Sequence, residues 1–356
     1  MQIEVIKPHE LDAPLLAAWS RIVERTSALD SPYFRPEFVQ LVGRVRKDVE
    51  VAVMRDSTGP IGFFPFQRSQ RVGRPVAGRL SDFQAVLAGE EVEYEPRELI
   101  AACGLSVWDF DHLHPSQSNF TKYVRLTDGS PFIDLSQGFA HYRQIRKTLG
   151  DSEMKQTERK ARKLNRDLGR LRLETHTTRP DVLRSAIEWK SQQYNRTNIT
   201  DVLSYGWVRE LLEQLIFESH TQFRGALTAL YAGDRLVACH LGMQSRDVLH
   251  YWFPTYDVEL SSYSPGRVMM LEMCRQADEY GIDRIDLGRG VSTFKQRCMT
   301  GMIQVGVGSV DRRPVGRAMR AGWRCAREWV KQTPLRGPVK APARLLYRVR
   351  EWMDFK

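Results

Sequence analysis

The sequence has few cysteines and lacks the long apolar runs of membrane-spanning helices. Its 356 residues include five cysteines, which are dispersed and form no CxxC pair. This spacing favours reduced thiols over a disulfide framework and argues against a cysteine-rich zinc site. The sequence contains no run of eighteen apolar residues, so no transmembrane helix is predicted. The first residues also lack the apolar core of a signal peptide. We therefore expect a cytoplasmic protein, and nothing in the sequence points to a metal.

The excess of positive charge is concentrated in two segments. The chain has 53 Lys and Arg residues against 43 Asp and Glu residues, a net charge of +10. Residues 311–356 contain 13 basic and 4 acidic residues, and residues 141–175 contain 11 and 5. Such segments fit phosphates, anionic lipid headgroups or nucleic acid, or they are solvated helical faces. The remaining body is mildly acidic, and 42% hydrophobic residues are typical of a globular protein.

The two halves of the chain show the same order of predicted elements. In the first half, helical patterns at 14–26 and after Pro36 precede strands at 49–54 and 61–66, and residues 80–89 read as a further short strand. In the second half, helices at 179–197 and 206–220 precede three strands within 223–257. This repeated order predicts a duplicated fold. A polar helix ending at Gly169 marks the boundary, with Leu164, Leu168 and Leu171 on one stripe.

A turn into a helix gives the first candidate binding site. Ser264, Pro265 and Gly266 follow the third strand of the second half and precede an apolar helical pattern that ends at Gly281. Free N–H groups at a helix start favour an anion, and Gly266 permits close backbone approach. Arg267 adds a positive charge. The turn fits a phosphate, although the same residues make an ordinary helix start.

Several short motifs in this region and in the first half occur together in one known family. They are AxHLG at Ala238 to Gly242, Tyr256-Asp257, Ser264 to Gly266, DLGRGxxxFK from Asp286 to Lys295, and residues 31–38, 62–66 and 80–84. On these motifs, the chain resembles the GCN5-related N-acetyltransferase (GNAT) superfamily over about residues 1–310. Within it, the chain looks like the CelD-type acyltransferases of cellulose and exopolysaccharide biosynthesis, relatives of the FemAB peptidyltransferases. Phe294 stands where that family usually has tyrosine, and the usual Q/R-x-x-G-x-G/A phosphate loop is absent.

The resemblance implies an α/β (α+β) fold of tandem GNAT-like domains, each a mixed, mostly antiparallel sheet flanked by helices. The domains would span residues 1–150 and 151–310, with the acyl-donor site in the second. It also implies acyl-CoA as co-substrate and transfer of an acyl group to an amine or hydroxyl of a sugar or other small polar acceptor. The donor would lie against Ser264, Pro265, Gly266, Arg267 and Arg289.

Acyl transfer needs a base for the acceptor's proton and groups that stabilise the developing charges. His240 is the first candidate for the base. His250, on the next strand, is a second candidate and is expected on the acceptor side. The alternative for each is a hydrogen-bonded core histidine. Tyr256 or Tyr251 is expected to protonate the leaving thiolate. Cys239 is excluded as a partner of His240 because adjacent strand residues point to opposite faces.

Further candidate side chains surround these positions. Asp286 and Lys295 form a second catalytic constellation with Arg289, or else a structural pair that clamps the turn. Lys190 and Tyr194 of the helix at 179–197, together with Asp82 of the first half, are expected on the acceptor side. A solvated helical face is the alternative for Lys190.

Two alternatives to an acyl-CoA enzyme stay open. The first is aminoacyl transfer from tRNA, which the basic helix before Arg170 would suit by charge. The second is a scaffold protein without catalytic activity in a polysaccharide-synthase complex. Residues 311–356 predict two basic amphipathic helices that would lie on an anionic membrane surface or dock on protein. The acceptor and the oligomeric state are not predicted.

Overall fold

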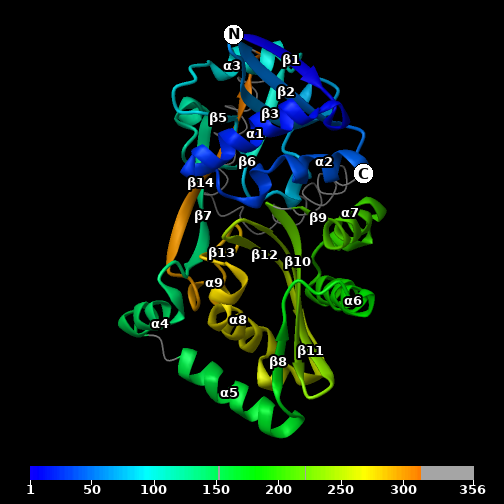
Figure 1. The fold of residues 1–356 in the computed structure, drawn as a ribbon, viewed down its shortest axis with the longest axis vertical. Coiled ribbons are helices and arrows are strands. Elements are labelled where there is room, and N and C mark those ends of the chain that lie inside the picture. The colour runs from blue at the N-terminus through cyan, green and yellow to red at the C-terminus, as the bar shows by residue number, and fades with distance from the viewer. Residues whose placement is uncertain (151–152, 221, 314–356) are drawn as a thin grey trace, which may run out of the picture.

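The computed structural model describes residues 1–150, 153–220 and 222–313 (Figure 1). The basic helices predicted within 311–356 therefore lie, from residue 314 onward, outside the described residues. In the described part of the chain, no helix has the length and apolar character needed to cross a membrane.

A single fourteen-stranded sheet runs through the molecule, in the order β1-β2-β3-β4-β6-β14-β7-β13-β12-β11-β10-β8, with β5 and β9 beside β3 and β10. All neighbours are antiparallel except β4 with β6 and β12 with β13. The strands are β1 (Gln2–Ile6), β2 (Val49–Asp56), β3 (Gly59–Ser69), β4 (Val72–Arg74), β5 (Leu87–Ala88), β6 (Val107–Leu113), β7 (Val124–Asp134), β8 (Leu171–Glu174), β9 (Ser219–His220), β10 (Phe223–Ala232), β11 (Arg235–Ser245), β12 (Val248–Tyr256), β13 (Arg284–Asp286) and β14 (Gly301–Asp311).

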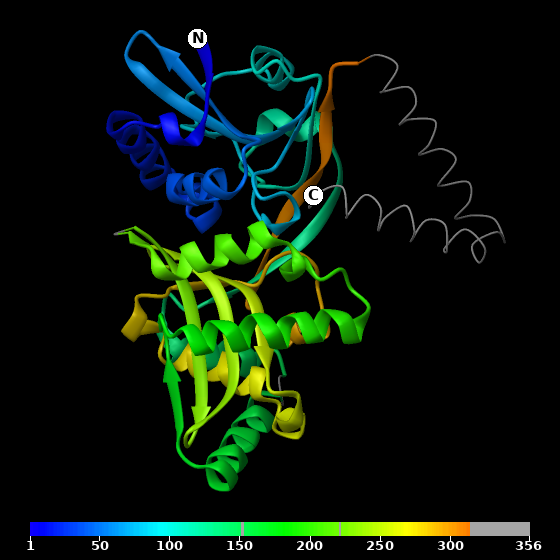
Figure 2. The same ribbon diagram turned by 90° about the vertical axis from the view of Figure 1, so that its right-hand side faces the viewer.

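Helices cover both faces of this sheet. In the second half, α6 and α7 lie on one face, and α8 with α5 lies on the other (Figure 2). Proline at the first position starts α2, α6 and α8, where its missing N–H costs no hydrogen bond. The α-helices are α1 (Ala13–Arg25), α2 (Pro36–Val45), α3 (Pro96–Ala102), α4 (Gly138–Thr148), α5 (Glu153–Leu168), α6 (Pro180–Thr197), α7 (Gly206–Phe217), α8 (Pro265–Arg275) and α9 (Thr293–Gln296).

Two strands join the halves. β7 of the first half pairs with β13 of the second, and β14 returns from the second half to lie between β6 and β7. One buried apolar cluster likewise contains Trp19 and Phe38 of the first half and Leu212 and Phe253 of the second. Both the sheet and the core are therefore continuous across the middle of the chain, which fixes the position of one half against the other.

The predicted fold class is confirmed: both halves place two helices before a strand hairpin within a mixed, mostly antiparallel sheet. One local prediction is wrong: residues 80–89 form mainly loop, with only β5 as strand. Gly169 does end α5, because its φ of 103° suits glycine, and Leu171 lies beyond that helix as the first residue of β8. The domain limits at 150 and 310 stay a prediction.

Candidate active site

The centre of the second half is a place where two parallel strands separate. β12 and β13 pair only from Val248 to His250, against Arg284 to Asp286. β12 then continues to Tyr256, whereas β13 ends. Beyond His250, no described strand pairs with this edge of β12. His250 and Tyr251 therefore lie at the fork, and as successive strand residues they point to opposite faces of the sheet.

Tyr251 lies on the α8 face, together with His240. The two rings stack with centroids 4.3 Å apart, and the ring of Phe294 in α9 lies 6.4 Å from that of Tyr251. His240 is fully buried, and neither of its ring nitrogens has a described hydrogen-bond partner of ordinary geometry. Burial, together with nearby His250, holds the pKa of His240 well below its usual value, so the ring is neutral. A catalytic role for His240 stays a prediction.

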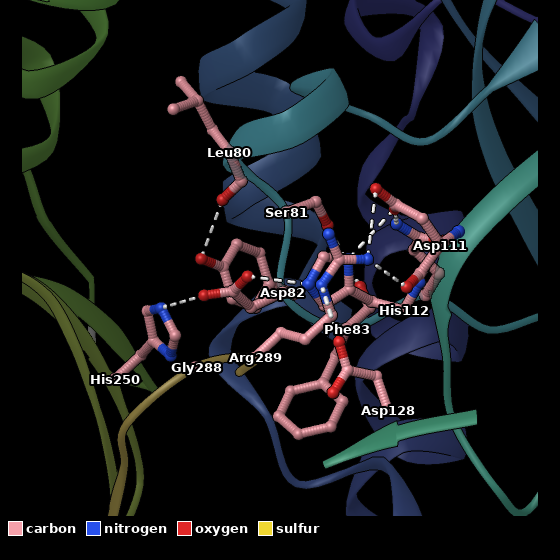
Figure 3. Close-up of polar contacts among 12 residues, drawn as sticks. Leu80, Ser81, Asp82, Phe83, Asp111, His112, Asp128, His250, Gly288 and Arg289 are labelled. Carbon is pink, nitrogen blue, oxygen red and sulfur yellow. Dashed lines mark hydrogen bonds and ion pairs between the residues drawn. The ribbon is translucent and has the colours of Figure 1, made fainter. Parts of the chain in front are cut away.

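His250 points the other way, toward the first half. Its Nε2 lies 3.2 Å from Oδ2 of Asp82 (Figure 3). The ring of Tyr33 meets the His250 ring edge-on, with the ring centres 4.9 Å apart. The side chain is fully buried, and its Nδ1 has no hydrogen-bond partner among the described residues. A Cβ at Gly288 would come within 2.4 Å of the Asp82 carboxylate, so only glycine leaves room here. The sequence-predicted residues Asp82 and His250 thus meet, from opposite halves of the chain.

The carboxylate of Asp82 also binds a second histidine, which the sequence reasoning missed. His112 Nε2 lies 3.0 Å from Asp82 Oδ1, and His112 Nδ1 lies 2.9 Å from Asp111 Oδ1 (Figure 3). Burial alone would lower the pKa of His112, but the contacts with Asp111 and Asp82 raise it to about 9. Burial would likewise raise the pKa of Asp82, yet the two histidines hold it well below its usual value. The result is a chain from His250 through Asp82 and His112 to Asp111, which we call the interdomain network.

The second predicted group, Asp286, Lys295 and Arg289, does not form one cluster in the structure. Lys295 Nζ donates to the carbonyl oxygens of Gly288 and Arg289, both at 2.8 Å, and so braces the turn after β13. Burial lowers the pKa of Lys295, although Asp82 opposes this effect. Arg289 donates to the Asp111 carbonyl at 2.9 Å and thereby joins the interdomain network.

Asp286 lies apart from both of these cations. It is buried and pairs with Arg284 at 2.9 Å, and Arg284 also binds Asp30 of the first half at 2.5 Å. Burial raises the pKa of Asp286, although Arg284 opposes the shift. Asp286 therefore holds Arg284, and Arg284 in turn pairs with Asp30 across the two halves. These are structural contacts, and the catalytic role of Asp286 stays a prediction.

The predicted donor turn lies on the α8 face and is covered by α5. Ser264 has a left-handed φ of 53°, and Pro265 begins the helix as expected. Lys160 of α5 donates to Ser264 Oγ at 2.8 Å and to the Ser262 carbonyl at 3.0 Å. Arg267 donates to Thr157 Oγ1 at 3.0 Å and pairs with Glu153. The turn thus carries more positive charge than the sequence motif indicated.

A cavity of about 140 Å³ extends from Arg267 between α5, α8 and α9. Its walls are mostly apolar, with a polar rim formed by two arginines and one glutamate. The lining residues are Tyr142, Glu153, Met154, Thr157, Arg267, Met270, Leu271, Thr293, Phe294, Arg297 and Cys298. The ring of Phe294, one of these lining residues, lies 6.4 Å from the ring of Tyr251 at the fork. We call this space the α8/α9 cavity.

On the other face, Lys190 of α6 lies beneath a polar cavity. Its Nζ donates to the Pro254 carbonyl at 3.0 Å and to Gln193 Oε1 at 3.2 Å, and it lies 5.2 Å from the centre of the Tyr194 ring. Burial lowers the pKa of Lys190 to about 8, so Lys190 is not on a solvated face. The cavity, of about 290 Å³, is lined by Tyr256, which also touches the Gly266 position.

The residues that the sequence reasoning missed are His112, Asp111, Lys160, Arg297 and Glu153. The adjacent Asp111-His112 in the strand Val107–Leu113 was a usable signal, because these ionisable residues, like Asp109, interrupt a strand that is apolar at its other positions. Lys160 at the donor turn and Glu153 and Arg297 at the α8/α9 cavity had no such signal. In the described part of the chain, no group of His, Cys, Asp and Glu side chains has the arrangement of a metal site.

Comparison with known proteins agrees with this geometry. Residues 152–296 match the family model described as an acetyltransferase (GNAT) domain. The matched part of the chain is therefore similar to a GNAT acetyltransferase domain, and it includes the fork, α6 and the donor turn. No curated protein matches the chain significantly.

Solved structures extend the likeness to both halves. FemX is 10% identical, with a TM-score of 0.57, and the match covers 88% of this chain and 97% of that one. The C-terminal domain (DUF2156) of a putative lysylphosphatidylglycerol synthetase from Agrobacterium fabrum is 12% identical, with a TM-score of 0.52 and coverage of 86% and 94%. A conserved protein of unknown function from Bacteroides thetaiotaomicron is 10% identical, with a TM-score of 0.50 and coverage of 81% and 95%. At these identities, the likeness shows the fold alone.

Proposed function

We propose that the protein is an acyltransferase that moves an acyl group from acyl-CoA to an amine or hydroxyl of a small polar acceptor. The observation that carries the proposal is the α8/α9 cavity, whose mostly apolar lining includes Arg267, Arg297 and Phe294, and the ring of Phe294 lies 6.4 Å from that of Tyr251 at the fork. A thioester donor with a phosphate-bearing tail needs this combination: cations for the phosphates and an apolar path for the arm that carries the acyl group.

The acceptor is proposed to approach from the opposite face of the sheet. That face holds the interdomain network and Lys190, and both cations and hydrogen-bonding groups are available there. The two substrates would meet at the fork, where β12 and β13 no longer pair. Holding both in one geometry supplies a large part of the rate enhancement in such reactions.

The proposed chemistry assigns separate proton transfers to His250 and Tyr251. The acceptor's nitrogen or oxygen attacks the thioester carbonyl, its proton passes to Nδ1 of His250, and the carbon–sulfur bond breaks. Asp82 holds Nε2 of the same ring and stabilises the imidazolium that forms. The Tyr251 hydroxyl, whose pKa is raised well above its usual value by burial, stays protonated and donates its proton to the leaving thiolate. The His250 proton then returns to the tyrosinate through solvent, which restores both groups.

The acceptor class is carried by the family resemblance, and a sugar or amino sugar of a cell-surface polysaccharide is the substrate we propose. Such a reaction would take place in the cytoplasm, at the inner face of the membrane. Any contact with lipid or a partner through residues 311–356 belongs to a segment that lies, from residue 314, outside the described residues.

Calorimetric titration with acetyl-CoA and longer acyl-CoAs tests the donor. We expect micromolar binding that weakens at least tenfold in Arg267→Ala and in Arg297→Ala. Arg275→Ala is the matched control, because Arg275 lies on the same helix but pairs with Glu272 and Glu158 outside the cavity. Binding that is unchanged in all three variants would contradict the proposed location, and no binding at millimolar donor would refute the function.

A second donor, aminoacyl-tRNA, is supported by one observation. The outer side of α5 exposes five cations: Lys155, Arg159, Arg162, Lys163 and Arg166. A polyanion would be attracted to this row, with strong dependence on salt. A protein that fails to bind acyl-CoA but binds tRNA at physiological salt would favour aminoacyl transfer, and one that binds neither would favour a scaffold.

A further inference from the structure

The start of α5 places a carboxylate between the two arginines of the α8/α9 cavity. Glu153 pairs with Arg267 of α8, and its other oxygen lies 3.4 Å from Arg297 Nη1, at the end of α9. Glu153 is the one acidic side chain among the residues that line the cavity. One carboxylate shared by two arginines from different elements has the charge pattern of a bound phosphate group.

We propose that Glu153 is an internal plug, which occupies the phosphate position of the donor site until the donor displaces it. The inference rests on the proposed function and adds a regulatory contact to it. The first turn of α5, with Glu153, Met154 and Thr157, forms one wall of the cavity. Donor binding would exchange the Glu153 carboxylate for a phosphate and move this turn outward.

The size of the cavity supports displacement. Its volume is about 140 Å³, whereas pockets that hold drug-sized ligands have about 300–1,000 Å³. A nucleotide-bearing donor therefore needs more space than the cavity offers with α5 in place. Arg267 and Arg297 belong to the α8/α9 side of the cavity, so the wall contributed by α5 is the one that can retreat without loss of the cations.

The contacts of α5 differ along its length. From Ala161 onward the helix is anchored by packing, because Ala161 and Leu164 are buried against the core beneath α8. In the first turn, Met154 is only partly buried against this core, and the other contacts are polar: Glu153 to the arginines and Thr157 to Arg267. Partly exposed ion pairs contribute little to stability, so this turn can open without unfolding the rest of the helix.

Charge removal at one position tests the plug. In Glu153→Gln, the side chain keeps its size but no longer competes for the arginines, and acetyl-CoA should bind about three- to tenfold more tightly, as expected if the open form rises from a minor to the main population. Glu158→Gln is the matched control: Glu158 lies on the same helix and pairs with Arg143 and Arg275, away from the cavity. Its dissociation constant should stay within twofold of the wild-type value.

Hydrogen exchange of the wild-type protein gives an independent readout. With saturating acetyl-CoA, the amides of residues 153–157 should exchange faster, whereas those of residues 161–168 should not change. Equal affinity in the wild type and Glu153→Gln, or slower exchange at 153–157, would overturn the plug while leaving the proposed function intact. Absence of acetyl-CoA binding in all three proteins would instead refute the proposed function and, with it, the plug.

Discussion

Replacing His112 by asparagine tests whether the interdomain network holds a buried positive charge. Burial opposes that charge, but Asp111 and Asp82 raise the pKa of His112 from 6.5 to about 9. The contribution to stability is complete below pH 6.5 and is lost as the pH rises to 9, because only the folded state keeps the proton. A pKa shift of this size contributes about 3 kcal/mol to the free energy of unfolding, and roughly 1.5 kcal/mol of that contribution is lost between pH 6.5 and pH 8.

The assay is urea unfolding of the wild type and His112→Asn at pH 6.5 and pH 8. The quantity of interest is the difference in unfolding free energy between the two proteins, since other titrating groups cancel in it. We expect this difference to shrink by about 1.5 kcal/mol from the lower to the higher pH. A difference that is the same at both pH values would refute the reasoning, because it would mean that folding does not raise the pKa of His112.

His114→Asn is the matched control, since it lies two residues away and should behave in the opposite sense. Burial lowers the pKa of His114 to about 4, so the unfolded chain takes up a proton before the folded one does. From pH 6.5 to pH 5, the unfolding free energy of the wild type should therefore fall by up to about 1.5 kcal/mol relative to that of this variant. Opposite pH dependences for the His112 and His114 variants would show a specific charge pair at His112, because a general effect of pH would act on both variants alike.

Two further substitutions address the site directly. In Gly288→Ala, the new Cβ would meet the Asp82 carboxylate, and the backbone φ of 73° disfavours any side chain. We expect the free energy of unfolding to fall by about 1–2 kcal/mol from the backbone alone, and acyl transfer to fall at least tenfold. A wild-type kcat/KM would contradict the role of this turn. In Lys190→Met, a buried amine whose pKa is lowered to about 8 is removed. At pH 7, the free energy of unfolding in urea should be about 1–2 kcal/mol higher for the variant, once the loss of two hydrogen bonds is subtracted. The KM for the acceptor should rise. A less stable variant would show that Lys190 is structural.

The fold could be predicted because local patterns and element order agree. Helical spacing and proline starts place α2, α6 and α8, and alternation places the hairpin β2–β3. The pairing of β7 with β13 and of β14 with β6 could not be read in the same way. These partners lie far apart in sequence, and no local pattern encodes which distant strand completes a sheet.

The site was predicted residue by residue, but its grouping was not. Asp82 and His250 were each singled out, yet their contact depends on the packing of one half against the other. Glu153 and Lys160 looked like ordinary members of a charged helix, because nothing in the sequence says that α5 lies over the start of α8. Charged residues on a helix surface acquire a role only from what the helix covers, and this information is tertiary.

Gly242, the glycine of the AxHLG motif, is required by the way β11 pairs with β12. The pairing of β11 with β12 shifts at Gly242, where a Cβ would lie 2.2 Å from the His250 carbonyl and 2.6 Å from the His240 ring. Any side chain here would push β12 away and change its register, and a shift of one residue exchanges the faces of His250 and Tyr251. The motif thus fixes which of these two groups faces the interdomain network and which faces the α8/α9 cavity. The proposed division of proton transfers between the two faces of the sheet would therefore depend on this glycine, which has no side chain to take part in the chemistry.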